Sequence, residues 1–250
     1  FHPETTIQIF FYFDWKKLPS PDKIDHFDVI ISAFPKKIVD DYVSALKKAS
    51  LRPVILEIES QAVVRSVVPK SESETPILIV DIGATRTSFI IFSGEAIRFT
   101  STIAVSGKDF NATLIEKLKV SPQDAELLKR NIGLDETKYN GKVYRTLLPI
   151  VDEFAENIRK YIDYYHLHSR HEHGQVKEIS KIILCGGDAN LTGFAAYMSM
   201  NLKISVELAN PWTNILKPPL KEIPGLPFAR SLSFTTAIGL ALRGVKGYFD

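Results

Sequence analysis

A polar turn, Asp81–Thr87, joins two short apolar stretches, Ile77–Val80 and Ser88–Phe92. Apolar runs of this length, bounded by turn residues, are typical of buried strands. Because the turn is short, the second strand must run back along the first. Ala96–Val105 follows a Ser93–Gly94 turn and continues the pattern as a third strand. The sequence therefore predicts a sheet built around a meander.

The turn carries groups that suit an anion and a metal ion. Gly83 lacks a Cβ, so a phosphate could approach the backbone closely, and the N–H groups of such a turn can point at phosphate oxygens. Thr85 and Thr87 add hydroxyl donors. Asp81 could hold a hydrated Mg²⁺ through water, because Mg²⁺ favours a carboxylate and several waters. An ordinary hairpin turn is the alternative that this motif alone leaves open.

The chain before this meander predicts a strand–helix–strand unit. Ile7–Phe13 and Phe27–Ala33 are expected as strands, and the second is expected to be buried. A helix is expected after Pro35, because apolar residues then recur at helical spacing. Leu51–Ile58 is expected as the next strand and Glu59–Val68 as a helix. This alternation is typical of an α/β or α+β layer.

The rest of the chain also alternates helices and strands. The polar residues 71–75 predict a boundary before the meander. Ser121 and Pro122 predict a helix start that ends at Gly133, while Pro149 predicts a kink in a later helix or its true start. The other expected elements are helix Asp109–Leu118, the amphipathic helical stretch Val143–Ile162, strand Lys181–Leu184, helix Phe194–Leu202, strand Ile204–Leu208, a proline-rich loop over 210–230 and helix Phe234–Leu242.

Composition limits the classes of protein that fit. The 250 residues are 45% hydrophobic and 24% charged, which is ordinary for a globular protein and excludes a disordered chain. The net charge of +2 gives no basic excess, so nucleic acid is not expected as the main partner. The single cysteine excludes a disulfide framework. No apolar run approaches the ~18 residues of a membrane helix. A reducing, cytosolic setting is expected.

Two further segments could contact a ligand. Leu184–Gly193 runs from an apolar strand through the paired glycines Gly186 and Gly187 into a helix, where a ring or a phosphate could lie against bare backbone. An ordinary strand–helix turn is the alternative. Glu126 and Lys129 share one face of a helix, which alone indicates a solvated ion pair.

The order of these motifs resembles that of the actin-like ATPases. The D-I-G-A turn at Asp81–Ala84 precedes Ala125–Gly133, which precedes Leu184–Gly193 and then Ala237–Gly244. Among the actin-like proteins the chain looks most like the PilM family of type IV pilus assembly, which is related to FtsA. Further similar segments are Ala33–Lys36, Ala49–Pro53, the positions Glu59, Ala62 and Arg65, and Ala209–Pro211.

The resemblance implies an α/β, actin-like (ribonuclease H-like) two-lobed ATPase fold. Residues 1–50 would form a small extra subdomain, and residues 51–75 with 227–250 the remainder of the first lobe. Residues 76–105 with 146–226 would form the second lobe, and 106–145 its cap. The family's first phosphate hairpin has no counterpart at the start of this sequence, so we expect the first lobe to be incomplete at the N-terminus.

The resemblance also implies a site for ATP and Mg²⁺. The nucleotide-binding residues would be Asp81, Gly83, Thr85, Thr87, Gly107, Glu126, Lys129, Gly186 and Gly187. Asp81 would hold Mg²⁺ through water, Glu126 would face the ribose and Lys129 the adenine. Glu59 would orient the attacking water.

Together with the missing first phosphate hairpin, two further departures from the family pattern predict slow hydrolysis or none. Arg86 replaces a small polar residue at the loop tip, and Asp188 places a carboxylate where the family usually has glycine. That carboxylate should weaken anion binding. The expected function is a nucleotide-binding assembly scaffold that is at most a weak ATPase. The alternatives are an active ATPase or sugar-kinase-type enzyme of the superfamily, or a nucleotide-free adaptor.

The resemblance implies a membrane partner as well. The partner would be the cytoplasmic N-terminal tail of a PilN-like membrane protein, which would hold this chain peripherally at the inner membrane. Lys36, Lys37 and Asp41 are the expected contact residues, because burial would not otherwise explain them on their helix. A homo-oligomer is also possible.

Four histidines lie close together in the sequence, at 166, 168, 171 and 173. Histidine is a common ligand of Zn²⁺. No cysteine accompanies them, and Glu172 is the single carboxylate in the run. A solvated loop is therefore favoured over a zinc site.

Overall fold

The computed structural model describes residues 11–17, 29–168, 177–216 and 225–245. The chain divides into two compact units, Phe1–Ile58 and Glu59–Asp250, called here the N-terminal and the C-terminal unit. Each unit is described by itself. The first four residues of the predicted strand Ile7–Phe13 lie outside the described residues.

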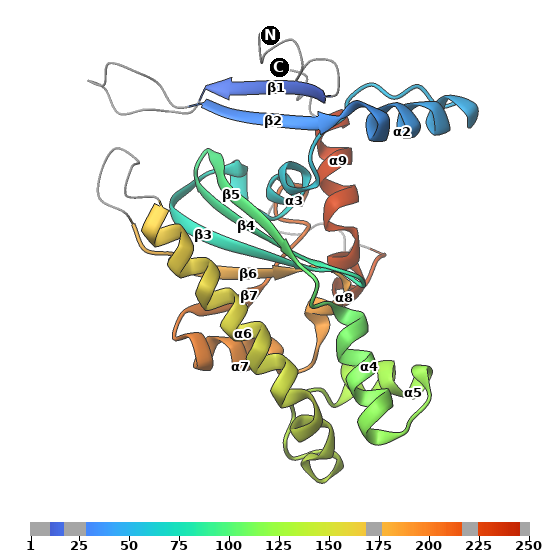
Figure 1. The fold of residues 1–250 in the computed structure, drawn as a ribbon, viewed down its shortest axis with the longest axis vertical. Helices are drawn as coiled ribbons and strands as arrows, with labels where there is room; N and C mark the ends of the chain where they lie inside the picture. The colour runs from blue at the N-terminus through green and yellow to red at the C-terminus, as the bar shows by residue number, and fades with distance from the viewer. Residues whose placement is uncertain (1–10, 18–28, 169–176, 217–224, 246–250) are drawn as a thin grey trace, which may run out of the picture. The chain divides into compact units, whose positions relative to one another are not determined.

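A five-stranded mixed sheet forms the centre of the C-terminal unit, in the order β5-β4-β3-β6-β7 (Figure 1). The strands are β3 (Ser73–Ile82), β4 (Thr87–Gly94), β5 (Ala96–Ile103), β6 (Lys181–Cys185) and β7 (Ser205–Leu208). The first three form the predicted antiparallel meander, while β6 is parallel to both β3 and β7. The sequence expectation for these strands is confirmed, except that β3 begins inside the polar segment predicted as a boundary.

Both faces of this sheet are buried. Phe89 in β4 makes ring contacts with Phe154 and Tyr161, both on helix α6 (Lys142–His168). Ile90 and Phe92 point to the opposite face of the strand and are buried as well. A sheet covered on both sides explains why the strands read as continuous apolar runs rather than as alternating ones.

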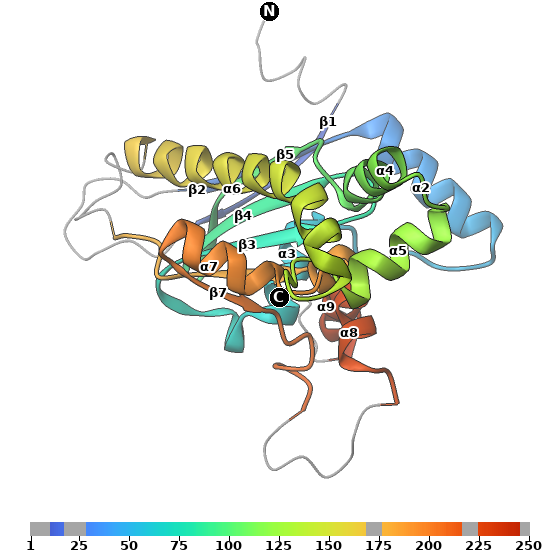
Figure 2. The same ribbon diagram turned by 90° about the horizontal axis from the view of Figure 1, so that it is seen from below.

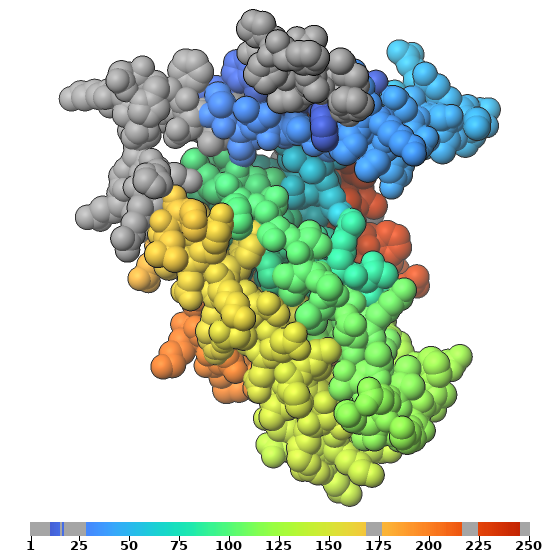
Figure 3. All heavy atoms as spheres, viewed as in Figure 1, coloured from blue at the N-terminus to red at the C-terminus, as the bar shows by residue number. Residues whose placement is uncertain are grey.

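Helices α4 (Gly107–Leu118) and α5 (Pro122–Asn131) lie side by side, and α4 packs against α6 (Figures 1 and 2). Figure 3 shows α4, α5 and α6 as one continuous surface. The α5 start is as predicted, since the Ser121 hydroxyl accepts the Asp124 N–H at 3.1 Å. Pro149 lies inside the unbroken helix α6, where it removes one backbone hydrogen bond without ending the helix.

Helix α3 (Glu59–Val67) packs against the last helix, α9 (Thr235–Val245). A Cβ on Gly239 would lie 1.8 Å from the Ala62 carbonyl oxygen, so this glycine allows the two backbones to approach. The Arg65 guanidinium donates to the Gly239 carbonyl at 3.0 Å. The other helical segments are α7 (Phe194–Leu202), α8 (Phe228–Ser231) and the 3-10 turns η1 (Pro69–Ser71), η2 (Tyr139–Gly141), η4 (Gly187–Asn190) and η5 (Leu232–Phe234).

The N-terminal unit contains a two-stranded antiparallel sheet, β1 (Phe11–Lys17) and β2 (Val29–Pro35), followed by helix α2 (Lys36–Lys48). The expectation of a buried strand at Phe27–Ala33 is wrong for the described residues of β2, whose side chains alternate between exposed and half-buried. A two-stranded ribbon has too few neighbours to cover both faces.

The predicted strand Leu51–Ile58 is also wrong, because the segment has no regular secondary structure. Its side chains alternate in exposure, as in an extended chain, but it pairs with no described strand. A strand exists through its ladder of hydrogen bonds with a neighbour, and apolar residues alone do not supply one. Within the described residues, no helix is long and apolar enough to cross a membrane.

Candidate functional site

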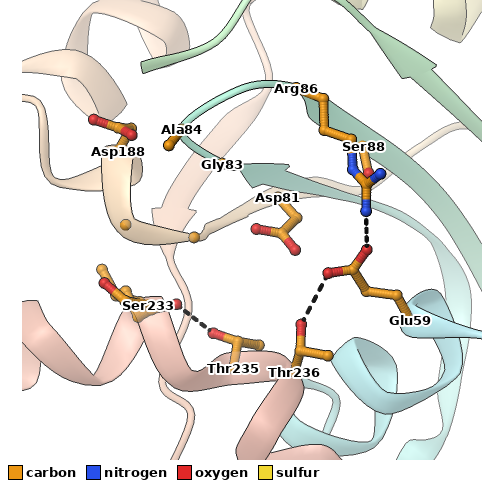
Figure 4. A pocket seen from close by; sticks show the side chains of 13 residues that line it. Glu59, Asp81, Gly83, Ala84, Arg86, Ser88, Asp188, Ser233, Thr235 and Thr236 are labelled. Carbon is orange, nitrogen blue, oxygen red and sulfur yellow. Dashed lines mark hydrogen bonds and ion pairs between the residues drawn. The ribbon is translucent and has the colours of Figure 1, made fainter. Parts of the chain in front are cut away.

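A cavity of about 350 Å³ opens in the C-terminal unit (Figure 4). Four segments border it: the end of β3 with its turn into β4, the paired glycines after β6, the start of α3, and η5 with the start of α9. Its lining residues are Glu59, Asp81, Gly83, Ala84, Arg86, Ser88, Gly186, Gly187, Asp188, Leu232, Ser233, Thr235 and Thr236.

Asp81 is the central carboxylate of the cavity. It lies near the end of β3, opposite Cys185 on one side and Ser88 on the other. Burial, followed by the negative charge of Glu59, raises the pKa of Asp81 to about 6. The carboxylate is therefore charged at neutral pH while most of it is withdrawn from water, which is a state that a bound cation would stabilise.

Gly186 makes room for Asp81. Its φ of +87° is in the region that glycine adopts readily. A Cβ at this position would lie 2.4 Å from both Asp81 Oδ1 and the Ile82 carbonyl oxygen. A side chain here would therefore push the carboxylate out of place.

The turn between β3 and β4 is fixed by backbone hydrogen bonds. The Gly83 N–H donates to the Arg86 carbonyl at 3.0 Å. The Gly83 and Ala84 carbonyls accept the Gly107 and Lys108 N–H groups, at 3.0 and 3.1 Å. These two bonds from the start of α4 hold the turn in place. They use the carbonyl groups of Gly83 and Ala84 and not the N–H groups of these two residues.

Glu59 links three of the four segments that border the cavity. Its Oε2 lies 2.9 Å from Arg86 Nη2, and its Oε1 accepts from the Thr236 hydroxyl at 3.4 Å (Figure 4). The lining contains three carboxylates, on Glu59, Asp81 and Asp188, against one guanidinium, on Arg86. This excess of negative charge favours a cation, or an anionic ligand that arrives with one.

A second charged cluster lies beyond Asp188. The buried Lys129 ammonium is 2.5 Å from Asp188 Oδ1 and 2.7 Å from Glu126 Oε2. Burial alone would raise the pKa of Glu126, but hydrogen bonds from Lys129, Asn111 and Arg130 outweigh it and lower that pKa to about 2. Glu126 is therefore held as an anion, and the Lys129 ammonium contacts both Glu126 and Asp188.

The structure brings only part of the predicted site to the cavity. Glu59, Asp81, Gly83, Gly186 and Gly187 line it. Gly107, Glu126 and Lys129 do not; they lie with Asp188 in the second cluster. Thr85 is exposed at the turn, and the buried Thr87 donates its hydroxyl to the Val105 carbonyl at 2.7 Å, a structural contact between strand ends.

Sequence reasoning missed three hydroxyl groups, on Ser233 in η5 and on Thr235 and Thr236 at the start of α9. The signal that could have revealed them is a hydroxyl-rich run, Ser231–Thr236, directly before an apolar helix. It also left Ser88 unassigned, although this residue follows the phosphate-type turn.

The donor chemistry of the cavity fits a hydrated Mg²⁺ with phosphate groups. Asp81 offers a charged oxygen, and Gly83, Gly186 and Gly187 leave backbone uncovered by side chains. The volume is at the low end of the ~300–1,000 Å³ of ligand pockets. It suits the phosphates and metal better than a whole nucleotide.

The described histidines lie outside this site. His166 and His168 are in the last turn of α6, and the His168 ring stacks on Tyr164 with centroids 3.8 Å apart. His171 and His173 lie outside the described residues. Within the residues that the structure describes, no group of three or more histidine, cysteine or acidic side chains is arranged to hold a metal ion.

Comparison with known proteins supports one fold. A structure of a PilM–PilN type IV pilus biogenesis complex aligns with a TM-score of 0.71 at 23% identity, covering 94% of this chain and 67% of that chain. MreB5 of Spiroplasma citri bound to ADP aligns with a TM-score of 0.62 at 14% identity, covering 86% of this chain and 67% of that chain.

A curated relative is cell division protein FtsA of Escherichia coli K12. It is 23% identical over 241 aligned residues, which cover 83% of this chain. The chain thus spans about half the length of this relative, 53%.

The fold is therefore actin-like. The family profile described as "Type IV pilus assembly protein PilM" matches residues 8–245. The chain therefore belongs to the PilM family.

Proposed function

We propose that this chain is a nucleotide-binding scaffold of type IV pilus assembly, which binds Mg²⁺-ATP in the cavity and the cytoplasmic tail of a PilN-like membrane protein. Nucleotide binding is proposed on one observation, the cavity that is lined by Asp81, by the glycines of two turns and by the hydroxyl groups at the start of α9. Family membership and the ADP-bound MreB5 structure support it.

The proposed division of labour follows from charge. Mg²⁺ would supply positive charge to the phosphates, and Asp81 would hold its water shell. The backbone at Gly83, Gly186 and Gly187 would admit the phosphates closely. Because carboxylates dominate the lining, a free triphosphate would be repelled, and binding should require the metal.

Titration calorimetry of ATP into the protein, with and without Mg²⁺, tests this proposal. Asp81→Ala should abolish Mg²⁺-dependent binding. Asp163→Asn, which removes an exposed carboxylate of α6, is the matched control and should bind like the parent. Equal ATP affinity in Asp81→Ala and the parent contradicts the proposed site.

We propose that hydrolysis is weak or absent. Phosphoryl transfer needs several groups positioned at once. Here Glu59, the residue that the resemblance assigns to the attacking water, already bonds to Arg86 and Thr236. Steady-state phosphate release should stay below the ~1–100 s⁻¹ of kinases. Turnover in that range, lost in Glu59→Gln, would instead support the active-enzyme alternative.

The partner site is proposed on helix α2. An extended peptide gains affinity from backbone pairing and side-chain pockets. Lys37 and Asp41 are exposed on this helix, and Lys36 lies with its Nζ 5.2 Å from the centroid of the Tyr12 ring. The PilM–PilN complex among the similar structures supports a partner of this kind.

A pull-down with the cytoplasmic tail of the cognate membrane protein tests this placement. Charge reversal at Lys36 and Lys37 should weaken capture. Reversal at Lys47 and Lys48, in the last turn of the same helix, changes the charge equally and should have less effect. Unchanged capture in the first variant, with loss on mutating Gly186–Gly193, would move the partner site to the cavity.

We also propose a cytoplasmic location at the inner membrane, through this partner. In cell fractionation the protein should sediment with membranes when the partner is present and remain in the supernatant when the partner is deleted. Sedimentation in both strains would contradict attachment through the partner. A homo-oligomer remains part of the proposal, and sedimentation velocity with and without Mg²⁺-ATP measures it.

A further inference from the structure

The cavity ends at the side chain of Asp188. Asp188 is in η4, directly after Gly186 and Gly187, and its carboxylate borders the cavity. Beyond it lie the start of α4, at Gly107, and the face of α5 that carries Lys129. Asp188 therefore stands between the cavity and the cluster that contains the buried lysine.

The contacts around Asp188 are close. Its Oδ1 lies 2.5 Å from Lys129 Nζ, and its Oδ2 lies 1.8 Å from the point where a Cβ on Gly107 would be. The side chains of Lys129 and Asp188 are 3% and 13% exposed, so water screens this pair little. The Asp188 carboxylate thus both packs against Gly107 at the start of α4 and forms an ion pair with Lys129.

Other hydrogen bonds also hold the chain around this ion pair. The Leu134 N–H donates to the Thr192 carbonyl at 2.8 Å, and the Thr192 hydroxyl donates to the Arg130 carbonyl. These two bonds hold the end of α5 to the segment after η4. Lys129 also keeps Glu126 as a partner at 2.7 Å if Asp188 is lost.

We propose that Asp188 is an internal competitor for Lys129, which keeps the nucleoside end of the site closed until the pair opens. The proposal rests on the proposed nucleotide function and adds its regulation. The open cavity has room for the phosphates and the metal. The base and the sugar would extend beyond it, past Asp188. Opening the pair exposes Lys129 and Glu126 to the ligand and costs binding free energy.

Three variants separate competition from simple charge repulsion. Asp188→Asn keeps the shape and removes the charge. Glu207→Gln is the matched control, because it removes the carboxylate of another lysine pair, Lys181–Glu207 at 2.5 Å, which is exposed between β6 and β7. Asp188→Gly removes the whole side chain. It covers the case in which the asparagine of Asp188→Asn still obstructs the base and sugar sterically.

Calorimetry with two ligands gives the first readout. Asp188→Asn or Asp188→Gly should tighten Mg²⁺-ATP about tenfold or more, and Mg²⁺-tripolyphosphate, which lacks the nucleoside, by much less. Glu207→Gln should change neither. An equal gain for both ligands means that Asp188 only repels phosphate, and it overturns the proposal.

Acetylation of lysines, read by mass spectrometry, gives a second readout without nucleotide. Lys129 should be protected in the parent and become several-fold more reactive in Asp188→Asn, while Glu207→Gln should affect Lys181 alone. An unreactive Lys129 in Asp188→Asn overturns the proposal. If the parent binds Mg²⁺-ATP as tightly as Asp188→Asn, the proposal fails and the nucleotide function stands. If no variant binds it, both fail.

Discussion

At the scale of residues, the cavity and the charged cluster beside it combine groups at strand ends with ion pairs between distant segments. Asp81, Gly83 and the paired glycines follow apolar strands, so their place at strand ends could be predicted. The contacts Arg86–Glu59 and Lys129–Asp188 join residues far apart in the chain. No local sequence pattern encodes such pairs, so the pairing of Lys129 with Asp188 could not be predicted from the motifs.

Asp81 should make the stability of the protein fall as pH rises. Its folded-state pKa of about 6 lies above the ordinary 3.8, so between these values the folded state binds more protons than the unfolded state. The free energy of unfolding then falls across pH 4–6, by on the order of 2–3 kcal/mol for this group. Asp81→Asn should not show this fall in the free energy of unfolding, because asparagine does not titrate.

Urea denaturation without divalent ions measures the effect. Asp81→Asn should match the parent near pH 4 and be more stable at pH 8, whereas Asp163→Asn should follow the parent throughout. Mg²⁺ should stabilise the parent at pH 8 and not Asp81→Asn. A parent and Asp81→Asn whose stabilities differ by the same amount at both pH values would contradict a raised pKa at Asp81.

Gly186→Ala should destabilise the fold by ~2 kcal/mol or more, because it adds a Cβ at positive φ into contact with backbone. Gly225→Ala adds the same atom in open space and should stay within about 0.5 kcal/mol of the parent. Denaturant midpoints compare the two variants. A similar shift in both would mean that position 186 is not sterically constrained.

At the scale of elements, the sequence predicted those whose pattern is local. The capped helix α5, the helix α7 and the meander β3–β5 follow from caps, spacing and turns, and the structure has them. Leu51–Ile58 has the composition of a strand, but pairing decides whether a strand forms, and no described strand pairs with this segment. The pairing of α3 with α9 joins distant segments, so periodicity alone could not reveal it.

Gly239→Ala should separate these two helices. The new Cβ would lie 1.8 Å from a backbone oxygen, at Ala62, which cannot rotate away as a side chain could. We expect a loss of ~2 kcal/mol or more in the free energy of unfolding. Weaker Mg²⁺-ATP binding should accompany it, because α3 and α9 supply Glu59 and Thr236 to the cavity.

Gly244→Ala is the control within the same helix. Nothing lies within 4 Å of its added Cβ, so it should be neutral or gain up to about 1 kcal/mol from helix propensity. Thermal melts and calorimetry on both variants provide the comparison. If Gly239→Ala is as stable as Gly244→Ala, the close approach of α3 and α9 is not required.

At the scale of the whole molecule, the two proposed sites fall in different compact units. The residues proposed for the partner, Lys36, Lys37 and Asp41, are in the N-terminal unit. Every residue that lines the cavity, from Glu59 to Thr236, is in the C-terminal unit. Sites built from separate sets of contacts can be removed one at a time, and the size of any coupling between them is then a measurable free energy.

Charge reversal at Lys36 and Lys37 should therefore weaken capture of the partner tail and leave Mg²⁺-ATP affinity within about twofold of the parent. Without nucleotide, Asp81→Ala should instead capture the tail as the parent does, while it loses Mg²⁺-ATP binding.

A scaffold that uses nucleotide to control assembly must also couple the two sites. In the parent, Mg²⁺-ATP should change the affinity for the tail, and the tail should change the affinity for Mg²⁺-ATP by the same factor. In Asp81→Ala, Mg²⁺-ATP should not change the affinity for the tail. Titration of the tail with and without Mg²⁺-ATP, in both proteins, measures it. Equal tail affinity in all four conditions would leave two independent sites and contradict nucleotide control.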